Sequence, residues 1–202
     1  MANAVQMPLR ERKKLDTRRR IFEVASHLFV DLGVQDTTIE AIAKAANVSK
    51  PTFFNYFSGK QEVLRELMTR MDEEFVSYIL HSVATGHSTQ QRLQLLMTQS
   101  GQHIQRRPDM TKLLLIEGMS DLGCPTVETS RMSILNDAMA TLVERGRREG
   151  DIDTKFSIEL QVQILVGGYL YGLLNWLSGD LKELNKTLQE TALFLAEALA
   201  PR

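Results

Sequence analysis

The stretch from Thr37 to Lys60, TTIEAIAKAANVSKPTFFNYFSGK, constrains the fold more than any other part of this 202-residue chain. After Thr37, apolar residues recur at i, i+3, i+4 and i+7, which predicts one apolar face of a short helix. Asn47 tolerates the left-handed backbone that ends a helix. Ser49 and Pro51 are typical of the cap and first turn of the next helix. The pattern therefore predicts two short helices that meet at a tight turn.

Two capping patterns mark the ends of this stretch. Thr37 and Glu40 form a Thr-x-x-Glu capping box, which is expected to open the first short helix. Ser58 and Gln61 repeat the pattern where the second short helix gives way to a longer one. Lys60 would then lie near the positive N-terminus of the longer helix, where a cation can hold a phosphate.

The second short helix has a polar outer face. Phe53 and Phe57, at i and i+4, are expected to face inward, which leaves Thr52, Asn55 and Tyr56 facing out. Small polar groups and a tyrosine on an exposed helix favour a helix-turn-helix motif, whose second helix enters the DNA major groove. The same helical corner also occurs in enzymes, so an enzyme stays open as an alternative.

Charge is divided unevenly along the chain. Residues 1–60 hold ten Lys or Arg and six Asp or Glu, a net charge of +4, whereas residues 61–202 hold 14 and 19, a net charge of −5. A basic head on an acidic body favours a protein that binds nucleic acid and has a second function elsewhere. A purely structural helical dimer is a third hypothesis, which the charge division argues against.

Residues 1–15 are polar and basic and are expected to form a mobile arm. Their cations could follow DNA phosphates, or the segment could be a solvated tail: Arg10, Arg12, Lys13 and Lys14. The segment has no apolar core of the kind found in signal peptides. A single cysteine, Cys124, excludes an intrachain disulfide and fits a reducing compartment, so a cytoplasmic location is expected.

Helical periodicity predicts an all-α chain without strands. A helix over 16–33, with an apolar stripe from Ile21 to Leu32, would complete a three-helix head around Phe29, Ile39, Ile42, Phe53 and Phe57. Further helices are predicted over 61–84, 89–107, 109–119, 126–149, 155–178 and 180–199. We expect a DNA-binding domain over 1–60, with its motif at about 37–57, and a ligand-binding and dimerisation domain over 61–202.

The segment Leu160–Gly179 contains no charged residue and is long enough to span a bilayer. Its glutamines, its asparagine and its four glycines favour instead a helix that is covered on two sides, one of them by a second subunit. We therefore expect no membrane insertion but a homodimer. The expected interface residues are Leu165, Gly168, Gly172, Leu188, Leu195 and Leu199.

The middle helices are rich in methionine, which suits an adaptable pocket for an apolar ligand but also fills cores. The expected pocket residues are Met68, Phe75, Met97, Leu114, Glu117, Met139 and Trp176. The four histidines show no metal-ligand spacing on one helix face. No nucleophile–base pair or glycine-rich phosphate loop is visible, so we expect no catalytic residue, no metal and no cofactor.

The chain resembles the TetR family of bacterial transcriptional regulators. The residues that carry the resemblance lie within Thr17–Gln61: Leu-Phe-x-x-x-Gly, then Thr-Thr-Ile-x-x-Ile-Ala, then Val-Ser-x-x-Thr-Phe-Phe-x-Tyr-Phe, then a lysine. Beyond this stretch only the number and lengths of the helices agree. The resemblance implies nine helices, a homodimer, and repression of genes that a small ligand releases, although some relatives activate.

By the same resemblance, base edges would be faced by Pro51, Thr52, Phe54 and Asn55. Phosphates would be held by Thr38, Tyr56 and Lys60, with Lys50 as a further backbone contact and Ser49 at the start of the reading helix. Phe54 stands where many members have tyrosine, which favours apolar contact with a thymine methyl group. Asn55 stands where histidine is frequent and could bind adenine through two hydrogen bonds.

Overall fold

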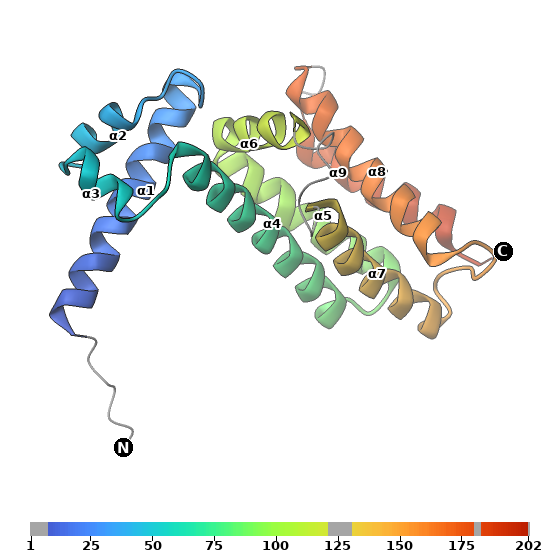
Figure 1. Cartoon of the computed structure of the whole chain (residues 1–202). Helices are drawn as coiled ribbons and strands as arrows, with labels where there is room; N and C mark the ends of the chain where they lie inside the picture. Colours follow the sequence, from blue (N-terminus) through green and yellow to red (C-terminus); the bar gives the residue numbers. More distant parts are fainter. Residues whose placement is uncertain (1–7, 121–130, 180–182, 202) are drawn as a thin grey trace. The chain divides into compact units, whose positions relative to one another are not determined.

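A computed structural model describes residues 8–120, 131–179 and 183–201. Within these ranges it contains nine α-helices and no strand, which confirms the expected all-α fold (Figure 1). The helices are α1 (Leu9–Leu32), α2 (Ile39–Ala45), α3 (Lys50–Phe54), α4 (Lys60–Thr85), α5 (Thr89–Arg106), α6 (Pro108–Ser120), α7 (Arg131–Glu149), α8 (Ile158–Leu177) and α9 (Leu184–Leu199).

The helices form two compact units. The first comprises Met1–Thr69 and Leu113–Glu117, and the second comprises Arg70–Lys112 and Gly118–Arg202. The division falls inside α4, so one continuous helix contributes to both units. The functional boundary expected after residue 60 stays a prediction.

The first unit is built on aromatic and aliphatic side chains of α1, α2 and α3. Ile21, Phe29, Ile42 and Phe53 are fully buried, and the rings of Phe53 and Phe57 lie 5.9 Å apart between centroids. Ile39, also expected in this core, is only half-buried. The expected three-helix head is therefore observed, with one side chain at its margin.

The expected apolar stripe of α1 is wrong at its C-terminal end. Leu32 is 51% exposed, whereas Val34, two residues later, is buried. Gly33 ends the helix with φ +83°, a left-handed backbone that redirects the chain, and Val34 then fills the position against the core.

The expected start of α1 is also wrong, because the helix begins at Leu9 rather than at Asp16. Pro8 precedes the first turn, Glu11 lies in that turn beside the positive helix end, and most residues that follow are good helix formers. The basic segment predicted as a mobile arm is therefore helical from Leu9, while residues 1–7 lie outside the described ranges. Asp16 lies inside the helix, 3.6 Å from Arg19 Nη2.

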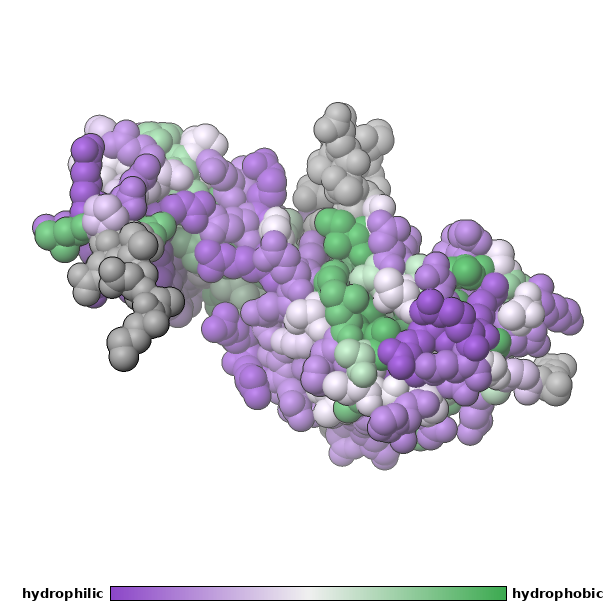
Figure 2. All heavy atoms as spheres, turned by 90° about the horizontal axis from the view of Figure 1, so that it is seen from below, coloured by the Kyte–Doolittle hydropathy of each residue, from purple (hydrophilic) through white to green (hydrophobic). Residues whose placement is uncertain are grey.

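The second unit packs α5 against α9, α7 against α8, and α8 against α9. Its core includes Leu93, Leu96, Met97, Met139, Leu142, Val143, Leu165, Leu188 and Leu195. On the face shown in Figure 2, most of the molecular surface is hydrophilic and apolar residues gather in a narrow strip. None of the helices in the described ranges is long and apolar enough to cross a membrane.

Phe29→Ala is expected to lower the free energy of unfolding by about 3–5 kcal/mol, because it leaves a cavity in the buried centre of the first unit. Leu32→Ala, on the same helix, is the matched control, and it should change stability by less than about 0.5 kcal/mol. Chemical denaturation followed by circular dichroism measures both. Equal losses for the two variants would contradict the packing described here.

Candidate DNA interface

The N-terminus of α2 is capped by Thr38, whose Oγ1 accepts a hydrogen bond from the Ala41 N–H at 3.1 Å. The expected capping box, which began at Thr37, is therefore wrong by one residue. Thr37 is buried, and its Oγ1 lies 2.7 Å from the carbonyl oxygen of Gly33 and 3.1 Å from that of Leu28. Its hydroxyl ties the connecting loop to the end of α1 and is not available as a cap.

The turn between α2 and α3 has the predicted backbone. Asn47 has φ +51°, in the left-handed region, and the Val48 N–H donates to the Ala43 carbonyl at 2.9 Å. Ser49 Oγ accepts from the Thr52 N–H at 3.1 Å and so caps α3. Arg20 Nε donates to the Ala46 carbonyl at 2.8 Å, which anchors the turn to α1.

The outer face of α3 and the turn after it presents the side chains that were predicted to contact DNA. Those exposed are Thr38, Ser49, Lys50, Pro51, Phe54 and Asn55, and those half-buried are Thr52 and Tyr56. The Phe54 ring is 46% exposed and lies edge-on to the buried Phe53 ring, with centroids 5.6 Å apart. Thr52 Oγ1 lies 2.7 Å from Ser49 Oγ, so one hydrogen bond of its hydroxyl is already made.

Lys50 is paired with an acid of the same motif. Its Nζ donates to Glu40 Oε1, which joins the start of α3 to α2 across the turn. This hydrogen bond lowers the pKa of the Glu40 carboxyl below its usual value. A DNA phosphate must compete with Glu40 for Lys50. The Lys50–Glu40 pair could not be predicted from local patterns, because its partners are 10 positions apart.

Lys60 has a structural role in this conformation. Its Nζ donates to three backbone carbonyls, those of Val34 at 2.7 Å, Gln35 at 2.8 Å and Thr37 at 2.9 Å. An ammonium group has three donors, so all are used. The phosphate contact predicted for Lys60 stays a prediction, and it requires that at least one of these bonds be exchanged.

Arg18 was not singled out by the sequence. Its Nη1 donates to Glu66 Oε1 at 3.0 Å and its Nη2 to Glu66 Oε2 at 2.5 Å, a two-pronged pair that raises the pKa of the guanidinium. Its Cζ also lies 4.5 Å from the centre of the Phe57 ring. No local pattern reveals this pair, because its partners are 48 positions apart.

The start of α4 is stabilised by Glu62 rather than by Gln61. The Ser58 N–H donates to Glu62 Oε2 at 2.5 Å, and this bond lowers the pKa of the Glu62 carboxyl. The reciprocal partner in the capping pattern was therefore predicted one residue too early.

The residues expected to form a ligand pocket are divided between the two units. Met68, Leu114 and Glu117 belong to the first unit, and Phe75, Met97, Met139 and Trp176 belong to the second. Met97 and Met139 are buried core residues. The Phe75 ring stacks on Tyr169, with centroids 4.7 Å apart, and Lys112 Nζ lies 5.2 Å from the Trp176 ring centre. The pocket stays a prediction.

Burial places the expected interface leucines inside a single subunit. All four are buried in the second unit: Leu165, Leu188, Leu195 and Leu199. Gly168 and Gly172 serve the same packing of α8 on α9, since a Cβ at Gly168 would lie 3.2 Å from Leu195 Cδ1 and one at Gly172 would lie 3.6 Å from Leu188 Cδ2. The apolar stripe on α9 therefore packs against helices of its own subunit.

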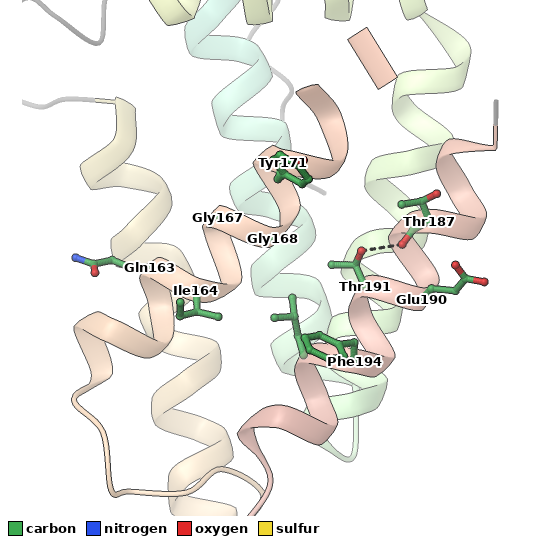
Figure 3. Close-up of a pocket in the computed structure, with 10 residues that line it drawn as sticks. Gln163, Ile164, Gly167, Gly168, Tyr171, Thr187, Glu190, Thr191 and Phe194 are labelled. Atoms are coloured by element: carbon green, nitrogen blue, oxygen red, sulfur yellow. Dashed lines mark hydrogen bonds between the residues drawn. The ribbon is translucent and has the colours of Figure 1, made fainter. Parts of the chain in front are cut away.

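A different set of side chains on α8 and α9 is exposed. Ile164 is 53% exposed, Tyr171 66% and Phe194 69%. They border a groove of about 580 Å³ whose floor contains Gly167 and Gly168 (Figure 3).

Among the described residues no cluster of His, Cys, Asp or Glu could hold a metal ion. Cys124 lies outside the described ranges.

These features define a helix-turn-helix DNA-binding protein with a second helical unit. Residues 21–67 match the family described as "Bacterial regulatory proteins, tetR family". Over these residues the chain carries the DNA-binding domain of the TetR family of transcriptional regulators, which confirms the resemblance.

Two curated relatives are similar over different lengths. The regulator TcmR of Streptomyces glaucescens is 39% identical over 69 residues, which are 34% of this chain and 30% of TcmR. The regulator SrpR of Pseudomonas putida is 24% identical over 162 residues, 79% of this chain and 74% of SrpR. Similarity to TcmR is therefore confined to less than a third of that protein.

Among solved structures, FadR of Thermus thermophilus superposes with a TM-score of 0.65 at 28% identity. The superposition covers 92% of this chain and 96% of FadR. That protein is described as a TetR family transcriptional repressor in complex with lauroyl-CoA. The likeness extends across both units, whereas the family match lies entirely in the first.

Glu40→Gln is expected to raise affinity for duplex DNA, because it frees the Lys50 ammonium to bind a phosphate. Fluorescence anisotropy should show about a three- to tenfold gain, and the gain should disappear in Glu40→Gln/Lys50→Gln. Glu23→Gln, an exposed acid on α1, controls for the change in net charge. A gain that persists without Lys50 would show that the pair does not compete with phosphate.

Proposed function

We propose that this protein is a homodimeric repressor that binds a palindromic operator and is released by a small apolar ligand. The observation that carries the proposal is the surface of α3, where exposed Pro51, Phe54 and Asn55 stand on a helix anchored by buried Phe53. Residues 1–60 would bind DNA and residues 61–202 would bind the ligand and the second subunit. As a regulator of bacterial genes it would act in the cytoplasm.

The proposed base contacts come from Pro51, Thr52, Phe54 and Asn55. The exposed Phe54 ring suits a thymine methyl group, and the Asn55 amide suits the N6 and N7 atoms of adenine. Tyr56 and Thr38, at the margins of this surface, would hold phosphates and so fix the register of the protein on the duplex. The operator is therefore expected to contain an A·T step under each reading helix.

Dimerisation is proposed through the exposed side of α8 and α9. Ile164, Tyr171 and Phe194 leave large apolar area in contact with water in the isolated chain, and the glycine floor of the groove lets a second copy approach closely. A twofold axis at this surface would relate two reading helices, which then bind half-sites about 34–36 Å apart or a multiple of that distance.

Ligand release needs a physical link between the two functions. A ligand can dissociate the repressor from DNA only if it binds more tightly to a conformation with a different spacing of the reading helices. The continuous helix α4 contributes to both units and is the proposed link. The methionine-rich middle helices favour an apolar ligand or an apolar part of a ligand, such as the lauroyl chain of the lauroyl-CoA bound by the Thermus thermophilus relative.

The DNA-binding proposal is tested with the promoter upstream of the protein's own gene in a gel-shift assay. Thr52→Ala and Tyr56→Ala should each weaken operator binding by about five- to 150-fold, because each removes a contact worth roughly 1–3 kcal/mol. Thr154→Ala, an exposed threonine of the second unit, should bind as the wild type does. Operator binding that neither Thr52→Ala nor Tyr56→Ala weakens would refute the proposed reading surface.

The dimer proposal is tested by Phe194→Glu, which places a charge on the exposed side of α9. Analytical ultracentrifugation should show a monomer at concentrations where the wild type is a dimer. Phe156→Glu is the matched control, because Phe156 is also more than half exposed but precedes α8. If Phe194→Glu stays dimeric, the proposed interface is wrong.

Activation of transcription is the alternative to repression. TetR-like activators bind the same kind of operator, so a reporter gene under the protein's own promoter separates the two. Deletion of the regulator should raise reporter expression if it represses and lower it if it activates.

A further inference from the structure

The first two turns of α1 do not pack against the rest of the first unit. Every side chain from Leu9 to Asp16 is exposed, and buried positions of α1 begin only at Ile21. In Figure 1 this part of α1 extends past α2 and α3. A helix with no apolar face to bury needs another reason to be where it is.

The exposed turns carry an unneutralised positive charge. Arg10, Arg12, Lys13 and Lys14 stand against a single acid, Glu11, before Asp16, and within the described part of the chain none of the four forms an ion pair.

Cations closer to the turn of the motif are already engaged. Lys50 is paired with Glu40, Lys60 is bound to loop carbonyls, and Arg18 is paired with Glu66. Apart from the exposed Lys44 of α2, the positive charge of the described part of the first unit that remains free for an outside anion is therefore concentrated at the start of α1.

Helix geometry aligns these cations with the reading surface. Arg10, Lys14 and Arg18 are spaced at i, i+4 and i+8, so they lie along one side of α1. Arg18 marks the inner end of this row, because its guanidinium lies 4.5 Å from the centre of the Phe57 ring, next in sequence to Tyr56. At a rise of 1.5 Å per residue, the row runs roughly 12 Å from Arg18 to Arg10.

We propose that Arg10, Lys13 and Lys14 bind DNA phosphates that flank the base pairs read by α3. The inference rests on the proposed function and names a second part of the same interface. The occupant is a phosphate backbone because Arg10, Lys13 and Lys14 are unpaired cations within about 6 Å of helix axis, a length that spans two or three phosphates of one strand. A fixed helical row holds phosphates without reading bases, so it should add affinity and no sequence preference.

The test compares the wild type with Arg10→Gln/Lys13→Gln/Lys14→Gln. Binding to the operator and to an unrelated duplex is measured by fluorescence anisotropy over a series of salt concentrations. Each lost phosphate contact should make the slope of log affinity against log salt shallower by about 0.9, or about 5 for a dimer. Affinity for the two duplexes should fall by the same factor.

Two further variants keep the result interpretable. Arg106→Gln/Arg107→Gln/Arg148→Gln removes the same charge from exposed positions of the second unit and should leave the salt slope unchanged. Arg10→Lys/Lys13→Arg/Lys14→Arg keeps the charge and should bind as the wild type does. Circular dichroism confirms that each variant is folded.

The outcomes separate this inference from the proposed function. If the wild type prefers the operator and the triple Gln variant keeps the wild-type salt slope, the inference is overturned and the proposed function stands. A loss confined to the operator would also overturn it, because the row would then read sequence. A wild type with no preference for any operator would overturn the proposed function and this inference with it.

Discussion

The Lys60 ammonium and its three carbonyl partners hold the geometry on which the DNA-reading surface depends. They fix the loop of residues 34–37 against the start of α4, while Thr37 fixes the same loop to the end of α1. The position of this loop sets where α2 begins, and the turn at Asn47 then sets the direction of α3. The Lys60 ammonium donates hydrogen bonds to loop carbonyls that have no partner within a helix.

Other charged side chains of the first unit are also used in bonds within the unit. Glu40, Glu62 and Glu66 each hold a donor of the first unit in place: the Lys50 ammonium, the Ser58 N–H and the Arg18 guanidinium. The net charge of +4 for residues 1–60 therefore does not show which of the cations are available on the surface. Some cations hold the motif together, and others are left free at its margin. Where a cation is paired, a DNA phosphate can bind it only by replacing the carboxylate. This exchange lowers the affinity for DNA and restricts the positions at which phosphates can bind.

The sequence predicted the short helices of the motif and the turn between them well, because both follow from local rules. Periodicity, Asn47 and the Ser49–Pro51 cap are properties of a few neighbouring residues, and the structure confirms them. The cap of α2 was misplaced because Thr37 and Thr38 are chemically equivalent and only the loop decides which one is buried.

The expected dimer interface stays a prediction, because helical spacing does not distinguish packing within a subunit from packing between subunits. A leucine stripe that packs on its own subunit has the same spacing as one that packs on a partner, so Leu188 and Leu195 could not be told apart from Phe194 by spacing alone. The Arg18–Glu66 pair joins residues far apart in the chain, which local patterns cannot detect. A ligand pocket and a domain boundary depend on how several helices pack together, which the spacing of residues along one helix does not encode.

The hydrogen bonds of Arg18, Arg20, Thr37, Lys50 and Lys60 join residues between Arg18 and Glu66. This segment coincides closely with residues 21–67, where the family pattern is found. Mutations after this segment can alter the rest of the chain without disturbing the bonds that orient α3. Such a protein can acquire a new effector during evolution while it keeps its place on the chromosome, so two genes with nearly the same operator can come to answer unrelated chemical signals.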